Sequence, residues 1–310
     1  RYFDRITRPE QIIQSFPMAV QTMLDPADCG PACISLSQDI QGQIFDYPED
    51  FFKEKIHTIR RPIPDEFQIK EAAKKIKSSK KPIIISGGGV FYSNAMEELS
   101  KFAIKHNIPV TQTVMGYSTI KRDHPNYAGQ IGGLGGKNTN TLAKQTDLAI
   151  AVGTKLADFT TGSWANFENE DFKLVSINVS RFDANKHLAQ AVVGDARASL
   201  NELSAALGDW KAPDEWNNKS QVELKSWNEH VDKESAPTNQ EVPSYVQVVG
   251  SIYKNSDPSD IAVTAAGGLV GEVIQVWRPR ELNTHETEWG FSCMSYEISG
   301  ALGIKMANPD

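Results

Sequence analysis

The sequence is poor in cysteine and contains neither a long apolar run nor an excess of positive charge. Its three cysteines, Cys29, Cys33 and Cys293, are odd in number, and no histidine or cysteine set follows them at zinc spacing. We therefore expect free thiols in a reducing compartment. No stretch approaches the roughly 18 apolar residues of a membrane span, and the first residues lack the apolar segment of a signal peptide. These absences predict a cytoplasmic location.

The charge and composition narrow the class of protein further. A formal net charge of −7 disfavours a nucleic-acid-binding surface, which needs a basic stripe. The 40% hydrophobic and 23% charged residues are typical of a globular protein. A chain of 310 residues allows about two domains at the usual size of roughly 150 residues each.

The segment from Lys81 to Asp195 predicts a Rossmann-like α/β domain with a parallel sheet. It contains short apolar runs without polar alternation, and helical patterns lie between several of them. Such runs are typical of a parallel sheet that helices cover on both faces. We expect strands at residues 81–86, 109–113, 148–153, 174–179 and 191–194. Helices are expected from Asp65, from Ser93, over 138–145 and after Asp195, and the first has the apolar face Ile69, Ala72, Ala73 and Ile76.

Residues 1–60 do not resemble a whole domain. A helical pattern over 9–23 contains Pro17, which should break or kink the helix, and residues 30–37 predict one strand. One helix and one strand cannot bury a core alone. Because the chain also lacks an initiating methionine, we expect this part to be the tail of a preceding domain, joined by a loop over 45–64.

The C-terminal part starts a second α/β pattern. Residues 208–241 carry Trp210, Trp216 and Trp227 in a polar background and predict a partly helical connector on the surface. A helix follows around residues 246–253, then a strand at 260–264, a short helix after Gly271 and a helix from Met294 to about Ala307. No further strand follows, so we expect this domain to be cut off within its sheet.

Candidate sites lie at the glycine-bearing turns that follow the strands, where open α/β sheets bind ligands. These turns are at 87–89, 153–155 and 267–268, and the glycine-rich stretch 132–136 has a similar character. None contains the dinucleotide fingerprint or a Walker lysine. Glycine that serves only a tight backbone turn therefore stays open as the alternative.

The histidines are scattered, and no nucleophile–histidine–carboxylate set can be assembled from spacing. His285 is of interest because Glu286, Glu288 and a glycine–aromatic loop follow it. We consider His285 and Glu288 candidate substrate residues, against the alternative of a solvated strand end.

Four stretches carry a resemblance to a known family. These are Ser86-Gly87-Gly88-Gly89-Val90 and the stretches 109–116, 147–153 and 291–307. They are similar to thiamine-diphosphate-dependent enzymes of the acetolactate synthase type. Within that family, residues 1–6, 264–269, 277–282 and 290–294 resemble hydrolases of inositol catabolism that open a polyhydroxylated cyclic dione. Ser295 stands where the pattern usually has glycine, and Val270 where it usually has proline.

The resemblance implies a domain layout. Residues 1–60 would be the C-terminal tail of the pyrimidine-binding domain, 61–210 the central domain, 211–240 a linker and 241–310 the first half of the diphosphate-binding domain. It places the activating glutamate upstream of Arg1 and the Mg²⁺ ligands beyond Asp310. No catalytic residue is then expected in this segment, which alone should be inactive.

The resemblance also implies the cofactors thiamine diphosphate and Mg²⁺. Gly267, Gly268 and Leu269 would let backbone approach the diphosphate. Ser292, Cys293 and Met294 would line the bend between the two rings, with the N-terminus of the helix from Met294 beneath it and Cys293 as a wall rather than a nucleophile. FAD is not expected, because residues 153–159 lack the arginines with which acetolactate synthases bind it.

The whole enzyme would be a homodimer or homotetramer that opens the dione ring to 5-deoxyglucuronate. Two alternatives stay open. One is another enzyme of the same family, a carboligase or 2-oxoacid decarboxylase. The other is a Rossmann module that binds a nucleotide without catalysis.

Overall fold

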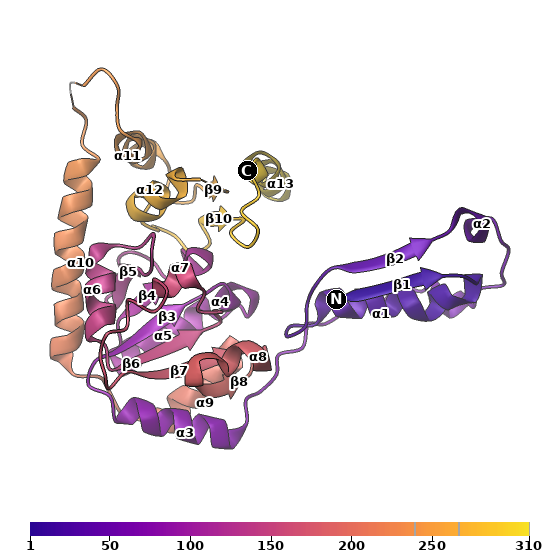
Figure 1. Cartoon of the computed structure of the whole chain (residues 1–310), viewed down its shortest axis with the longest axis horizontal. Helices are drawn as coiled ribbons and strands as arrows, with labels where there is room; N and C mark the ends of the chain where they lie inside the picture. Colours follow the sequence, from indigo (N-terminus) through magenta and orange to yellow (C-terminus); the bar gives the residue numbers. More distant parts are fainter. Residues whose placement is uncertain (239, 266, 310) are drawn as a thin grey trace.

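The computed structural model describes residues 1–238, 240–265 and 267–309. Its centre is a six-stranded, wholly parallel sheet with the strand order β5-β4-β3-β6-β7-β8 (Figure 1). The strands are β3 (Pro82–Ser86), β4 (Val110–Gln112), β5 (Tyr127–Gln130), β6 (Leu148–Val152), β7 (Lys173–Asn178) and β8 (Gln190–Val193). The order reverses between β3 and β6, as in Rossmann-like folds, so the predicted fold class is confirmed.

Helices cover both faces of this sheet because its strands are apolar on both sides. Ile84 packs under α3 (Glu66–Lys77), α5 (Met96–His106) and α9 (Ala196–Leu207). Its neighbours Ile83 and Ile85 face the other way, toward α6 (Lys137–Gln145). The predicted face of α3 is buried in full. Short helices fill the connections: α4 (Gly89–Tyr92), η3 (Val114–Gly116), α7 (Asp158–Thr161), α8 (Arg181–Ala184) and η4 (Lys186–Leu188).

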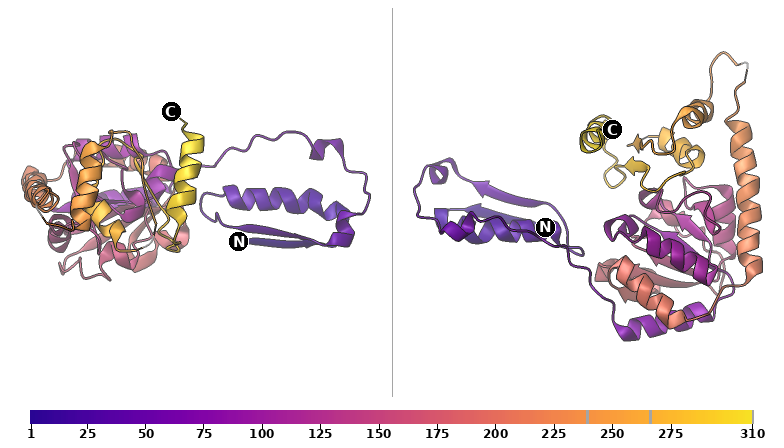
Figure 2. Two further views of the ribbon diagram at one scale, coloured as in Figure 1. Left: turned by 90° about the horizontal axis from the view of Figure 1, so that it is seen from above. Right: turned by 180° about the vertical axis from the view of Figure 1, so that it is seen from behind.

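The N-terminal part stands away from the sheet in every view (Figures 1 and 2). It consists of β1 (Tyr2–Ile6), η1 (Pro9–Gln11), α1 (Ile12–Leu24), β2 (Ala32–Leu36), α2 (Gln38–Gln41) and η2 (Glu49–Phe51). The predicted strand at 30–37 is present, but it pairs in parallel with β1, which sequence reasoning missed. Of the predicted break or kink at Pro17, the break is absent, because α1 continues through that residue; the kink stays a prediction. Ser15 and Ala19 on either side of it are buried, and this packing offsets the hydrogen bond that proline removes.

The segment between 208 and 241 is more than a surface connector. It contains α10 (Asp214–Glu234), a helix of 21 residues that packs along the β5 edge of the sheet. Trp216 is buried in the core on the α6 side and donates from Nε1 to the carbonyl of Pro82 over 2.8 Å. Leu224, two turns further on, belongs to the opposite core.

The C-terminal part contains α11 (Tyr245–Asn255), β9 (Ala262–Thr264), α12 (Leu269–Val276), β10 (His285–Thr287) and α13 (Tyr296–Ala307). The expected starts of the last two helices are wrong. Helix α12 begins at Leu269 rather than after Gly271, since Gly268 already has helical backbone angles. Helix α13 begins at Tyr296 rather than Met294, because Ser295 at its N-cap is left-handed, with φ of 70°. No helix in the described part of the chain is long and apolar enough to cross a membrane.

Candidate functional site

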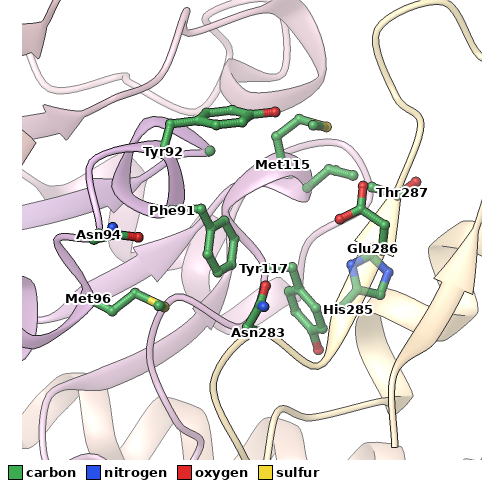
Figure 3. A pocket seen from close by; sticks show the side chains of 12 residues that line it. Phe91, Tyr92, Asn94, Met96, Met115, Tyr117, Asn283, His285, Glu286 and Thr287 are labelled. Atoms are coloured by element: carbon green, nitrogen blue, oxygen red, sulfur yellow. The ribbon is translucent and has the colours of Figure 1, made fainter. Parts of the chain in front are cut away.

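A cavity of about 290 Å³ lies between the carboxyl edge of the central sheet and strand β10 (Figure 3). Phe91, Tyr92 and Met115 approach it from the central domain, and His285, Glu286 and Thr287 approach it from β10. The remaining lining residues are Gly88, Asn94, Met96, Val114, Tyr117 and Asn283. This is the edge at which parallel sheets place their ligands. We refer to it as the β10 pocket.

The glycines beside the pocket are required by backbone packing. A Cβ atom on Gly87 would lie 2.4 Å from the carbonyl oxygen of Gly153, and one on Gly116 would lie 2.2 Å from that of Ser86. The amide of Gly89 donates to the carbonyl of Gly153 over 2.9 Å. The turns at 87–89 and 153–155 therefore close on each other, which favours the structural alternative for both.

The open glycines lie at the end of β9. A Cβ atom on Gly267 or Gly268 would meet nothing within 4 Å, and Gly267 has φ of 104°, which favours glycine. Both are exposed, and Leu269 begins α12, whose first amide groups have no partner within the helix. Ala266 lies outside the described residues. An open, positively polarised backbone of this kind fits an anionic diphosphate.

The second predicted cofactor loop, Ser292 to Met294, leaves the same edge. Strands β9 and β10 pair in parallel with Thr287 opposite Thr264, so the chain segments that follow them emerge side by side. Ser292 has φ of 53°, and all three residues are exposed. The structure therefore brings the two predicted loops to one edge.

Glu288 holds this second loop in place. Its carboxylate accepts from the amide of Phe291 over 2.8 Å and from that of Cys293 over 2.6 Å. The bond from the Cys293 amide is the main reason why the pKa of Glu288 lies below its ordinary value. The same carboxylate raises the pKa of the Cys293 thiol, which keeps the thiol protonated and weakly nucleophilic. The contacts of Glu288 are thus with the 291–293 backbone and the Cys293 thiol, while its predicted contact with substrate stays a prediction.

His285 forms the floor of the pocket and is buried. Its Nε2 lies 3.3 Å from the hydroxyl of Thr264, and its ring contacts that of Tyr117 edge-on with centroids 5.1 Å apart. Burial lowers the pKa of His285 to about 4, so the imidazole is neutral at pH 7. The alternative of a solvated strand end is wrong for His285, because the strand end is covered by the central domain.

Sequence reasoning did not select Glu286 and Thr287 as site residues. Glu286 is half-buried and lies 3.4 Å from the hydroxyl of Tyr296. The hydroxyl of Thr287 is buried and has no hydrogen-bond partner among the described residues. The run His285-Glu286-Thr287 was the available signal, but sequence gives no way to tell which of its side chains reach a cavity.

Among the described residues, no group of three or more histidine, cysteine, aspartate or glutamate side chains could hold a metal ion. Cys29, Cys33 and Cys293 are free thiols, as predicted.

Comparison with known proteins gives a family match for the region of the central sheet. Residues 69–203 match the family of the thiamine pyrophosphate enzyme central domain. The whole chain is similar to 3D-(3,5/4)-trihydroxycyclohexane-1,2-dione hydrolases, with 37% identity to that of Geobacillus thermodenitrificans and 39% to those of Bacillus licheniformis and Clostridium tetani. The chain spans 52% of the length of each of these relatives, and each alignment covers 100% of the chain. These matches confirm the resemblance that the sequence motifs indicated.

Proposed function

Because residues 69–203 match the thiamine pyrophosphate enzyme central domain, we propose that the complete gene product is a thiamine-diphosphate-dependent hydrolase. Its substrate would be 3D-(3,5/4)-trihydroxycyclohexane-1,2-dione, which it opens by cleaving the bond between the two carbonyl carbons, giving 5-deoxyglucuronate in inositol catabolism. The observation that carries the proposal is that the entire chain, including its N-terminal and C-terminal parts, aligns with 3D-(3,5/4)-trihydroxycyclohexane-1,2-dione hydrolases.

Thiamine diphosphate would be held by the backbone of Gly267, Gly268 and Leu269, with Ser292, Cys293 and Met294 against its rings. When bound, it supplies a nucleophilic carbon and an electron sink for cleaving a bond next to a carbonyl. Mg²⁺ would accompany the diphosphate through ligands expected beyond Asp310. The support from this chain is the open glycine backbone at the end of β9.

The residues of this chain would position the cofactor loop and the substrate rather than transfer protons. The Glu288 carboxylate fixes the 291–293 backbone through two amide hydrogen bonds. His285 is neutral at pH 7, so it can serve as a hydrogen-bonding group without adding charge beside the reacting carbonyls. The C-terminal part forms one wall of the pocket through His285, Glu286 and Thr287.

The decisive test is an assay of the complete gene product with thiamine diphosphate, Mg²⁺ and the dione. We expect formation of the open-chain deoxyglucuronate and no comparable turnover of pyruvate. Absence of ring opening by a folded, cofactor-loaded protein would falsify the proposed activity. Turnover of pyruvate instead would identify a carboligase or a decarboxylase on the same scaffold.

The cofactor loop can be tested without catalysis. Gly268 has φ of −68° and open space around it, so Gly268→Ala should fold with unchanged stability. If the diphosphate approaches this backbone, the added methyl group should weaken binding of thiamine diphosphate about tenfold, measured by calorimetry. The control is Gly303→Ala on α13, which also meets nothing within 4 Å. Equal cofactor affinity in the two variants would move the diphosphate away from this loop.

We further propose a cytoplasmic homodimer or homotetramer. On α13, the side chains of Ile298, Leu302 and Met306 recur every four residues and are all largely exposed, which is typical of a helix face that another surface covers, either a second subunit or the continuation of the same domain. Light scattering on the complete gene product should give at least twice the monomer mass, and a monomer would contradict this assembly.

A further inference from the structure

We infer that the β10 pocket binds the hydroxyl-bearing ring of a neutral polyol, with the hydroxyl of Thr287 and the carboxylate of Glu286 as its hydrogen-bonding partners. The inference deepens the proposed function and rests on it for the identity of the natural substrate. The pocket itself indicates the chemical class of the ligand.

Thr287 is the first observation. The residue is only 4% exposed, it lines the cavity, and its hydroxyl has no partner among the described residues. A buried hydroxyl without a hydrogen bond costs about 1–3 kcal/mol. A ligand hydroxyl in the cavity would satisfy it, since a hydroxyl group both donates and accepts.

The charges around the cavity are the second observation. None of the residues that line it is a lysine or an arginine, and the imidazole of His285 is neutral at pH 7 because burial lowers its pKa to about 4. The single charged group is the carboxylate of Glu286. A phosphate or carboxylate ligand would therefore meet repulsion and no compensating cation, which excludes anionic ligands from this pocket.

The shape and the remaining walls are the third observation. A volume of about 290 Å³ lies at the small end of ligand sites, which run from about 300 to 1,000 Å³. Phe91 and Met115 supply apolar surface for the C–H face of a ring, while Asn283 adds an amide that can donate or accept (Figure 3). A six-carbon ring that carries several hydroxyl groups matches this combination of one apolar side and several polar groups.

The test uses the complete gene product and the stable polyol myo-inositol, with binding followed by ligand-observed NMR titration. We expect saturable binding that inorganic phosphate does not displace. Thr287→Val keeps the shape but removes the hydroxyl, so it should weaken binding about tenfold while the Tm stays unchanged or rises. Glu286→Gln should weaken binding by a similar factor. The controls Thr141→Val and Glu297→Gln, on the remote helix α6 and the exposed start of α13, should bind as the wild type does.

Each outcome decides the inference. Undiminished binding by Thr287→Val, a lower Tm for that variant, displacement by phosphate, or no saturable binding to the wild type would overturn it. The ring-opening assay is separate from this titration. If the enzyme opens the ring but both variants bind inositol as the wild type does, the hydrolase activity stands and the polyol site in the pocket is rejected. If the titration gives the expected result but no ring opening occurs, the polyol site stands and the hydrolase activity is rejected.

Discussion

His285 is a buried side chain whose surroundings could not be inferred from the residues next to it in the sequence. Spacing identified it as a candidate because carboxylates and a glycine–aromatic loop follow it. The structure adds that the imidazole lies between Thr264 and Tyr117 and is cut off from solvent. Sequence could not separate the roles of Glu286 and Glu288, because the pocket wall that distinguishes them is formed by residues almost 200 positions earlier.

The burial of His285 predicts a pH-dependent stability. Its pKa is about 4 in the folded protein, against an ordinary value of 6.5. As the pH falls from 6.5 to 4, the unfolded chain therefore binds a proton that the folded protein does not. Folding stability should decrease over this window by about 3 kcal/mol from this group, and the group contributes no difference above the window.

Urea unfolding of wild type and His285→Gln at several pH values tests this. We expect the variant to lose less stability than the wild type on acidification, because glutamine does not titrate. The control His57→Gln changes an exposed imidazole and should follow the wild-type profile. Parallel profiles for wild type and His285→Gln would show that the imidazole is not held neutral by burial.

At the scale of elements, the apolar runs were sufficient to predict most of the central sheet. The strands at 81–86, 109–113, 148–153, 174–179 and 191–194 are present, because wholly buried strands need no polar alternation. Strand β5 was missed because its four residues, Tyr-Ala-Gly-Gln, lack an apolar run. The start of α13 depends on the left-handed Ser295, a conformation that composition does not reveal.

Two aspartate N-caps give a matched prediction about helix stability. Asp65 caps α3, accepting from the amide of Phe67 over 2.9 Å, and is exposed. Asp195 caps α9, accepting from the amide of Arg197 over 3.0 Å, but it is buried and also contacts Arg61 over 3.0 Å. Asp65→Ala should cost about 1 kcal/mol, the usual value of a cap. Asp195→Ala should cost about 2 kcal/mol or more, because Arg61 loses its partner as well.

Chemical denaturation of both alanine variants measures the difference directly. Asp195→Asn should recover the capping part of the loss but not the contribution of Arg61. If the two alanine variants lose equal stability, the contact with Arg61 contributes nothing measurable.

At the scale of the whole molecule, the central domain and the C-terminal part are joined by a packed interface. Val114 and Tyr117 pack against Val270 and Ile274 of α12. The hydroxyl of Tyr117 lies 2.7 and 2.6 Å from the carbonyl oxygens of Ile274 and Trp277 and shares its single hydrogen between them. Arg122 donates from its backbone to the carbonyl of Pro279 over 2.7 Å. The sequence predicted the α/β patterns of the central domain and of the C-terminal part, but not the interface between them. The residues that form this interface lie about 150 positions apart and share no periodic pattern. The boundaries of the domains stay predictions.

Removal of the Tyr117 hydroxyl should loosen this interface. Tyr117→Phe leaves two buried carbonyls without their donor, which should cost about 1–3 kcal/mol and raise hydrogen exchange in α12 and β10 while the central strands stay protected. The control Tyr245→Phe removes an exposed hydroxyl. Uniform faster exchange over the whole chain would mean instead that the two parts unfold as one unit.

Some glycines near the site are tightly packed and others face open space, and this difference matters for engineering. At Gly87, Gly116 and Gly153 the backbone of one turn occupies the space where another turn would need a side chain. A combinatorial library aimed at a new ligand should hold those positions invariant. Its diversity belongs at Glu286 of β10, which lines the pocket and is only half-buried, whereas His285 and Thr287 on either side of it are buried.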